Sequence, residues 1–132
     1  MTVFDWFNAR ATCSVDVIFE KLKLDLSSDV DKAQAKRPVH NGVLAHYGFQ
    51  FIVSDDGNKL KVVVHGHNVR DSVSFRLTKD SIEILDHSGA VKFSAEPTLN
   101  NKGECRLKIN GEEQELWYLR KLALEDLFFR TY

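Results

Sequence analysis

The chain has 132 residues, of which 43% are hydrophobic and 28% are charged, a composition typical of a globular protein. This length suits one domain, so we expect residues 1–132 to form a single folded unit with a substantial core. Its 18 Lys and Arg residues are balanced by 19 Asp and Glu residues, which gives a formal net charge of -1. Because sequence-independent binding to phosphates needs a surplus of basic residues, this balance argues against nucleic acids and anionic membranes as partners.

The sequence indicates neither a secretory leader nor a membrane-spanning stretch. Its first ten residues, MTVFDWFNAR, lack the basic segment and the apolar run of a signal peptide. No stretch approaches the roughly 20 apolar residues that cross a bilayer. The two cysteines, Cys13 and Cys105, have no metal-binding spacing, and we interpret them as reduced, half-buried residues. We therefore expect a cytoplasmic protein, although a protein exported without a cleaved signal would look the same.

The N-terminal third of the chain shows helical patterns. Residues 2–10 predict a short helix with Thr2 as its N-cap. Residues 14–26 are ambiguous, because they fit a helix while residues 21–26 also alternate as a strand would. The apolar residues that share one helical face are Val15, Ile18, Phe19, Leu22 and Leu26. The abundance of Glu, Lys and Leu favours a helix there, and the polar residues 27–37 indicate either a weak helical turn or a loop.

From Val43 onward the apolar residues recur with a period of two, which is typical of strands. In residues 43–67 the turn-forming pair Asp56-Gly57 separates two alternating runs. A two-residue loop there predicts the apolar pairs Phe49–Val64, Phe51–Val62 and Val53–Leu60. Because these residues share one face, we predict a hairpin whose aromatic side chains are buried.

Further alternating runs predict that the sheet continues as a meander. Residues 73–77, 82–86 and 91–95 indicate three more strands, and residues 96–103 indicate a loop. The pair Asn110-Gly111 is a strong hairpin signal, and residues 119–129 fit a terminal helix. The charged pairs that this second hairpin predicts are Lys108–Glu113 and Arg106–Glu115. The sequence therefore predicts an α+β fold, in which a curved antiparallel sheet carries N-terminal and C-terminal helices on one face.

The sequence contains no catalytic or nucleotide-binding motif of the Gly-rich, HExxH, GxSxG or CxxC kind. Residues 48–52, GFQFI, resemble part of the RNP1 motif of RNA-recognition domains, whose aromatic residues stack on bases. Tyr47 stands where the motif has a basic residue, Gln50 stands where it has a small one, and the predicted pairing buries both phenylalanines. We therefore expect no cofactor and no nucleic-acid partner, and a binding module in preference to an enzyme.

Three histidines form the first candidate site. His65 and His67 lie two apart on one predicted strand, and the hairpin register places His46 opposite His67. Three imidazoles are a ligand set suited to Zn²⁺, but no fourth ligand can be identified, so we predict no bound metal. The other interpretations are a solvated face or a histidine surface that binds a partner. With Tyr47, the three histidines would also suit the lining of a ligand cleft between sheet and helices.

The terminal helix carries the second candidate site. Leu124, Phe128 and Tyr132 follow one another at i, i+4 and i+8, roughly opposite a first apolar stripe. That first stripe, which we expect to face the core, comprises Leu119, Leu122, Ala123, Leu127 and Phe129. The second stripe contacts either the aromatic N-terminal residues of the same chain or another chain.

These observations predict a non-enzymatic protein-interaction module, such as an adaptor, an inhibitor or an immunity-type partner protein. Its contact residues would be Leu124, Phe128 and Tyr132, with the exposed face of the sheet as a further contact surface. The partner would be another protein or a second copy of the chain in a homodimer. The alternative is a small-molecule-binding domain or minor enzyme that uses the histidine-lined cleft.

Overall fold

The structure, a computed structural model, describes residues 3–37, 39–40, 42–130 and 132. Its first helix, α1 (Trp6–Thr12), begins after Asp5, whose carboxylate accepts a hydrogen bond from the Asn8 backbone N–H at 3.0 Å. A short N-terminal helix is therefore confirmed, although it starts later than predicted. The predicted cap, Thr2, lies outside the described residues.

The second helix, α2 (Val15–Ala35), settles the ambiguity of residues 14–26 in favour of a helix. Ser14 caps it, because its hydroxyl accepts a hydrogen bond from the Val17 backbone N–H at 3.4 Å. The side chains that α2 buries are Ile18, Phe19, Leu22, Leu26 and Val30. Because Val30 continues the buried stripe by one more turn, residues 27–35 are helical despite the polar composition that indicated a turn or a loop.

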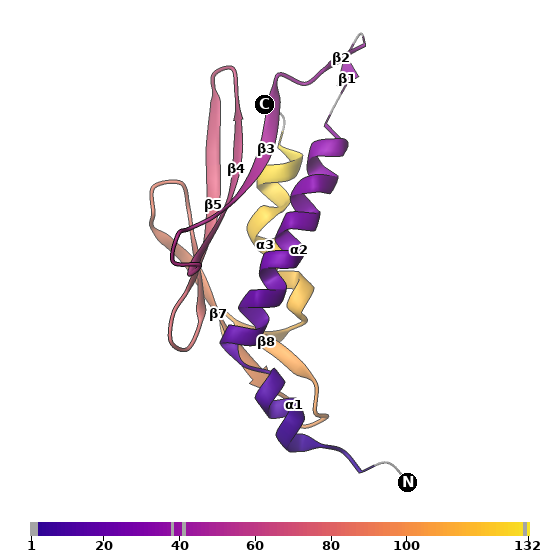
Figure 1. The fold of residues 1–132 in the computed structure, drawn as a ribbon, viewed down its shortest axis with the longest axis vertical. Coiled ribbons are helices and arrows are strands. Elements are labelled where there is room, and N and C mark those ends of the chain that lie inside the picture. The colour runs from indigo at the N-terminus through magenta and orange to yellow at the C-terminus, as the bar shows by residue number, and fades with distance from the viewer. Residues whose placement is uncertain (1–2, 38, 41, 131) are drawn as a thin grey trace.

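Seven antiparallel strands follow as a meander, in which each strand pairs with the next one along the chain (Figure 1). They are β3 (Tyr47–Val53), β4 (Lys59–Gly66), β5 (Val69–Leu77), β6 (Ile82–Leu85), β7 (Val91–Leu99), β8 (Cys105–Ile109) and β9 (Glu112–Gln114). A separate ribbon of β1 (Val39–His40) and β2 (Val43–Leu44) links α2 to this sheet. The predicted α+β class and the curved antiparallel sheet are confirmed.

Both predicted hairpins have the expected register. In the first, Phe49 pairs with Val64, and the other two predicted pairs are present as well. In the second, Lys108 pairs with Glu113, and an Arg106–Glu115 ion pair at 3.0 Å lies just beyond. Asn110 and Gly111 have φ values of 53° and 81°, the positive values that a two-residue type I′ turn requires.

The prediction of a loop over residues 96–103 is wrong, because β7 continues to Leu99 and only the following residues turn. Pro97 lies inside this strand and pairs with Leu107 of β8. A proline is tolerated here because Ala95 is the last residue of β7 that pairs with β6, through Ile82. Beyond Ala95, β7 pairs with β8 only.

The helices α2 and α3 (Leu116–Phe129) cover one face of the sheet, and the other face carries no helix (Figure 1). Side chains fill the space between these helices and the sheet. The largest fully buried ones include Phe19, Leu26, Leu60, Phe75, Ile84, Leu107, Leu119, Leu124 and Leu127. The ligand cleft that the sequence placed in this space is therefore occupied by core side chains in the part of the chain described.

The terminal helix buries Leu119, Ala123 and Leu127 as predicted, but its buried face is rotated toward Leu124. Leu124, predicted to contact a partner, is only 2% exposed, whereas Leu122 and Phe129, predicted to lie in the core, are 41% and 82% exposed. The buried positions of α3 are Leu119, Ala123, Leu124 and Leu127. These form one continuous arc, so the sheet selects the stripe that includes Leu124 and leaves Leu122 outside.

The end of the second stripe also has partners inside the chain. The ring of Phe128 meets Phe49 edge-on with centroids 5.2 Å apart, and Tyr132 lies 4.9 Å from Tyr47. The Tyr132 hydroxyl donates a 2.6 Å hydrogen bond to the Leu127 carbonyl oxygen, and burial raises its pKa. The aromatic start of β3 therefore extends the core to the end of α3, in a way that the helical periodicity alone does not reveal.

The interpretation of the cysteines as separate reduced thiols is wrong, because Cys13 and Cys105 form a disulfide with a Cα–Cα distance of 5.4 Å. They are 92 residues apart in the chain. The bond joins the α1–α2 junction to the first residue of β8. Only the fold brings these positions together, so their spacing in the sequence gave no sign of the pairing.

The N-terminal segment projects from the body of the molecule (Figure 1). Phe4, Trp6 and Phe7 are 56%, 65% and 70% exposed, so they do not pack against the terminal helix as one interpretation of the sequence proposed. In the described ranges, no helix has the length and apolar character needed to cross a membrane.

Candidate functional site

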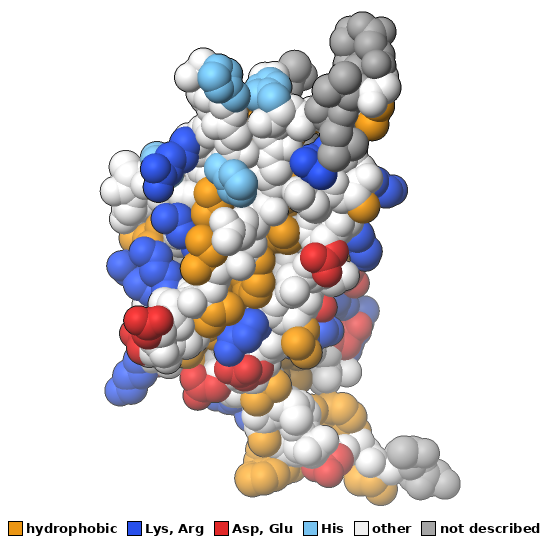
Figure 2. All heavy atoms as spheres, turned by 45° about the horizontal axis from the view of Figure 1, so that its top comes forward, with side chains coloured by type: hydrophobic (Ala, Val, Ile, Leu, Met, Phe, Trp, Pro, Cys, Tyr) orange, Lys and Arg blue, Asp and Glu red, His pale blue; other side chains and the backbone are white. Residues whose placement is uncertain are grey.

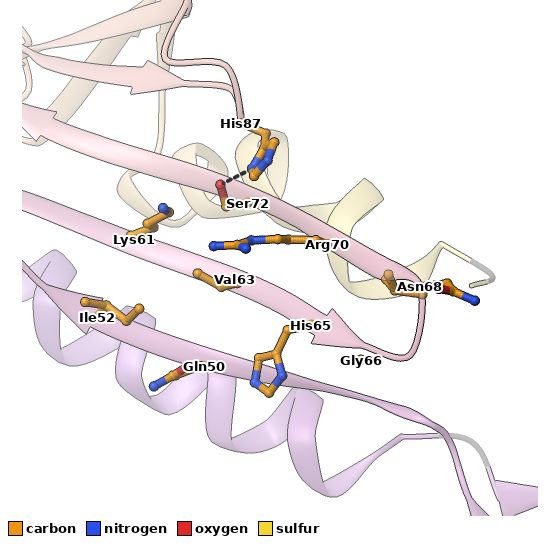
Figure 3. Close-up of a pocket in the computed structure, with 11 residues that line it drawn as sticks. Gln50, Ile52, Lys61, Val63, His65, Gly66, Asn68, Arg70, Ser72 and His87 are labelled. Carbon is orange, nitrogen blue, oxygen red and sulfur yellow. Dashed lines mark hydrogen bonds between the residues drawn. The ribbon is translucent and has the colours of Figure 1, made fainter.

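The helix-free side of β3, β4 and β5, here called the outer face, carries a groove of about 930 Å³ (Figure 3). Strand β3 contributes Gln50 and Ile52, and β4 contributes Lys61, Val63 and His65. Strand β5 contributes Arg70 and Ser72, while His87 comes from the turn after β6. We call this depression the outer groove.

The alternation of each strand places these residues together. On β4 the apolar Leu60, Val62 and Val64 are buried under the helices, so Lys61, Val63 and His65 point the other way. The pairing of strands then aligns the outward residues in rows. One row contains Gln50, Val63 and Ser72, and the next contains His65 and Arg70. The outer groove is thus built on strands and two short turns, which contribute Asn68 and His87.

The outer groove carries positive charge without a compensating acid. Lys61 and Arg70 line it together with two histidines, and no Asp or Glu is among its lining residues. Of the arginines, which all lie in the described ranges, Arg70 alone has neither a hydrogen-bond nor an ion-pair partner there. In Figure 3 its side chain lies along the strands in the direction of Lys61.

Two acidic residues on the neighbouring strands β5 and β6 are engaged elsewhere. Asp71, the neighbour of Arg70 in the chain, accepts a 2.8 Å hydrogen bond from Arg130. Glu83 accepts a 2.7 Å hydrogen bond from Arg76. Since these carboxylates are already paired, the positive charge of the outer groove remains available to a ligand.

A hydrogen bond fixes one wall of the outer groove. The Ser72 hydroxyl lies 3.0 Å from Nδ1 of His87, and Ser72 is only 3% exposed (Figure 3). The turn that carries His87 is held by Asp86, whose carboxylate accepts hydrogen bonds from the Ser88 hydroxyl at 2.6 Å and the Ala90 N–H at 3.0 Å. These two hydrogen bonds, that of Ser88 above all, lower the pKa of Asp86.

The residues predicted as a ligand-binding set do not all line the outer groove, although the rings of His46 and Tyr47 meet edge-on with centroids 5.6 Å apart. His65 lines the outer groove, whereas Tyr47 is buried on the opposite, helix-covered side of the sheet. His46 and His67 are exposed near the end of the β3–β4 hairpin, and Figure 2 shows histidine side chains gathered at this end of the molecule. In the part of the chain described, no three His, Cys, Asp or Glu side chains are placed to hold a metal ion.

Sequence reasoning missed Lys61, Arg70, Ser72 and His87 as members of a common site. Lys61 is an outward residue of the predicted hairpin over residues 43–67, so the predicted register contained the signal for it. Arg70 and Ser72 lie before the strand predicted over residues 73–77, because β5 begins at Val69, earlier than the alternating pattern indicated. The position of His87 depends on how the β6–β7 turn folds back toward β5, which no local pattern encodes.

Comparisons of this chain with protein-family models, with curated proteins and with solved structures found no match.

Proposed function

We propose that the chain is a non-enzymatic protein-interaction module that binds its partner through the outer face of β3–β5. The observation that carries this proposal is the outer groove, in which Arg70 and Lys61 lie beside apolar Val63 and Ile52. Neither cation has an ion-pair partner in the described ranges, and no Asp or Glu lines the groove. Interface cores favour arginine together with apolar contact area. Leu124, Phe128 and Tyr132 are not part of this surface, because they pack inside the chain.

The shape of the outer groove favours a polypeptide segment over a small molecule. Small-molecule sites are typically concave enough to bury most of the surface of their ligand. The outer groove instead lies on a sheet face that no helix covers. A ligand there is covered from one side only, which suits a segment held by many modest contacts along its length.

The Ser72–His87 hydrogen bond does not carry an enzymatic proposal. With 3% exposure, the Ser72 hydroxyl lies below the surface that a substrate would reach. The carboxylate of the neighbouring Asp86 is bonded to Ser88 and Ala90 of the turn. It therefore does not orient the His87 imidazole in the way that the aspartate of a catalytic triad orients its histidine. The pair is better explained as a support for the groove wall.

The proposal also concerns the cellular compartment in which the protein meets its partner. One support for the expectation of a cytoplasmic protein was the reduced state of the cysteines, and the Cys13–Cys105 disulfide removes it. Because persistent disulfides are typical of oxidising compartments, the bond favours a partner that is met in such a compartment.

The proposal can be tested by placing a photo-crosslinking amino acid at Gln50 in the outer groove and, as a control, at Leu24. Leu24 is 73% exposed and lies on α2, behind the sheet. Irradiation in the native cell should give an adduct of defined mass from position 50 and none from position 24. A mass of twice the chain would identify a second copy as the partner. Adducts from position 24 alone would contradict the proposal.

A further inference from the structure

The outer groove has the charge and spacing to select an acidic ligand. Resting on the proposed function, we infer that the bound segment of the partner is an extended acidic peptide that presents carboxylates to Arg70 and Lys61. The first argument is that Arg70 has no hydrogen-bond or ion-pair partner in the described ranges. The other arginines there are all bonded within the chain. A guanidinium binds a planar carboxylate with two parallel hydrogen bonds, so Arg70 is suited to this ligand.

The second argument is the spacing of the two cations. Lys61 and His65, the cross-strand partner of Arg70, are four residues apart on β4, so their Cα atoms lie about 13 Å apart. The Arg70 side chain extends along the strands toward Lys61, which brings the charged ends closer than the backbone positions (Figure 3). In an extended peptide, side chains at i and i+2 point the same way about 7 Å apart. Acidic residues two or four positions apart, about 7 or 13 Å, therefore cover the range from closer charged ends to the backbone separation of the two cations.

The third argument is the apolar floor between the charges. Val63 lies on β4 midway between Lys61 and His65, and Ile52, which is 41% exposed, lies opposite Lys61. These side chains limit access of water to the groove floor, and ion pairs formed next to apolar surface are screened less than ion pairs in open solvent. His87 adds a polar group at the wall, because its Nδ1 is engaged by Ser72 and its Nε2 is the ring nitrogen left for a ligand.

The test measures binding of a fluorescein-labelled peptide, Glu-Val-Glu-Val-Glu, by fluorescence anisotropy at low salt. We expect the dissociation constant to rise on the order of 10-fold with R70Q and with K61Q, which is the loss expected for one charge-assisted hydrogen bond. The matched control is R76Q, on the same face of β5 but paired with Glu83, and it should change the dissociation constant less than threefold. A peptide with Gln in place of Glu should bind at least 10-fold more weakly, and added salt should weaken binding of the acidic peptide.

Three kinds of outcome would overturn the inference. The first is equal affinity for the Glu and Gln peptides, or an R70Q variant that folds normally and binds as tightly as the original chain. The second is a phosphoserine version of the peptide that binds more than 10-fold more tightly than the Glu version and is displaced by inorganic phosphate, because the site would then be specific for phosphate. If no peptide binds while position 50 still crosslinks to a protein, this inference fails and the proposed function stands.

Discussion

At the scale of single residues, two serines on β5 show how the outer face distributes its polar groups. Ser72 and Ser74 are 3% and 4% exposed, and they are the buried polar residues of the described core. Ser72 is bonded to His87, whereas Ser74 makes no such contact with a histidine. The same residue type therefore has a specific structural role at one position and only a packing role at the other.

This difference gives the first prediction. Replacing Ser72 with Ala should release His87 from the groove wall and lower the free energy of unfolding by about 1 kcal/mol, the usual net value of one hydrogen bond. Ser74→Ala is the matched control, and it should leave the His87 imidazole signals unchanged in an NMR spectrum. The two variants are compared by urea denaturation and by those signals. An identical His87 spectrum in Ser72→Ala would show that the hydrogen bond has no positioning role.

At the scale of elements, α2 protects the free edge of the sheet. Strand β3 has a neighbour on one side only, and such an edge can pair with other chains. The Gln34 side chain accepts a 2.7 Å hydrogen bond from the Phe49 N–H, and Arg37 donates one of 3.2 Å to the Tyr47 carbonyl oxygen. The last turns of α2 thus satisfy edge groups that would otherwise be open to another strand.

The second prediction concerns this edge. Gln34→Ala should lower the free energy of unfolding by roughly 1–3 kcal/mol, because the Phe49 N–H is then left without its partner. Gln50→Ala, on the same strand but on the outer face, is the control and should change stability by less than about 0.5 kcal/mol. Sedimentation of both variants should show self-association only in Gln34→Ala. Equal stability of the two variants would mean that water replaces the glutamine without cost.

The sequence predicted correctly those elements in which the local apolar pattern matches the face that the fold buries. Phe49 and Phe51 alternate beside an Asp-Gly turn, so the register of the β3–β4 hairpin followed from residues alone. The terminal helix offered two apolar stripes, and only the aromatic start of β3 decides that Leu124 is buried. The prediction that His67 lies on the strand and that His46 pairs with it is wrong, because β4 ends at Gly66 and ladder pairing begins at Tyr47.

At the scale of the whole molecule, the disulfide links two regions that lie far apart in the sequence. Cys13 precedes α2, and Cys105 is the first residue of β8. The bond therefore closes a chain segment across a sequence separation of 92 residues. A crosslink across so many residues restricts the unfolded chain strongly, which stabilises the folded state. The core cluster between sheet and helices does not include Cys13, although Cys13 is buried and Cys105 packs against that cluster. We therefore expect most of the fold to form without the bond.

The third prediction follows from this separation. The double variant Cys13→Ser/Cys105→Ser should keep the circular dichroism spectrum but lose about 2–5 kcal/mol of unfolding free energy, the range found for native disulfides. The original chain in reducing agent should show the same loss, which controls for the serine side chains. Titration of the oxidised chain with a thiol reagent under denaturing conditions should find no free thiol. Two free thiols in the protein purified without reductant would contradict the pairing.

The central claim is that binding takes place on the outer face of β3–β5 and not on the helices. The most direct measurement is an amide ¹H–¹⁵N NMR titration of the chain with the Glu-Val-Glu-Val-Glu peptide. We expect the largest shifts at Val63, His65, Arg70 and Ser72, with the amides of α3 unchanged. Shifts centred on α3 or on the aromatic residues of α1, with the β4 and β5 amides unmoved, would contradict the account.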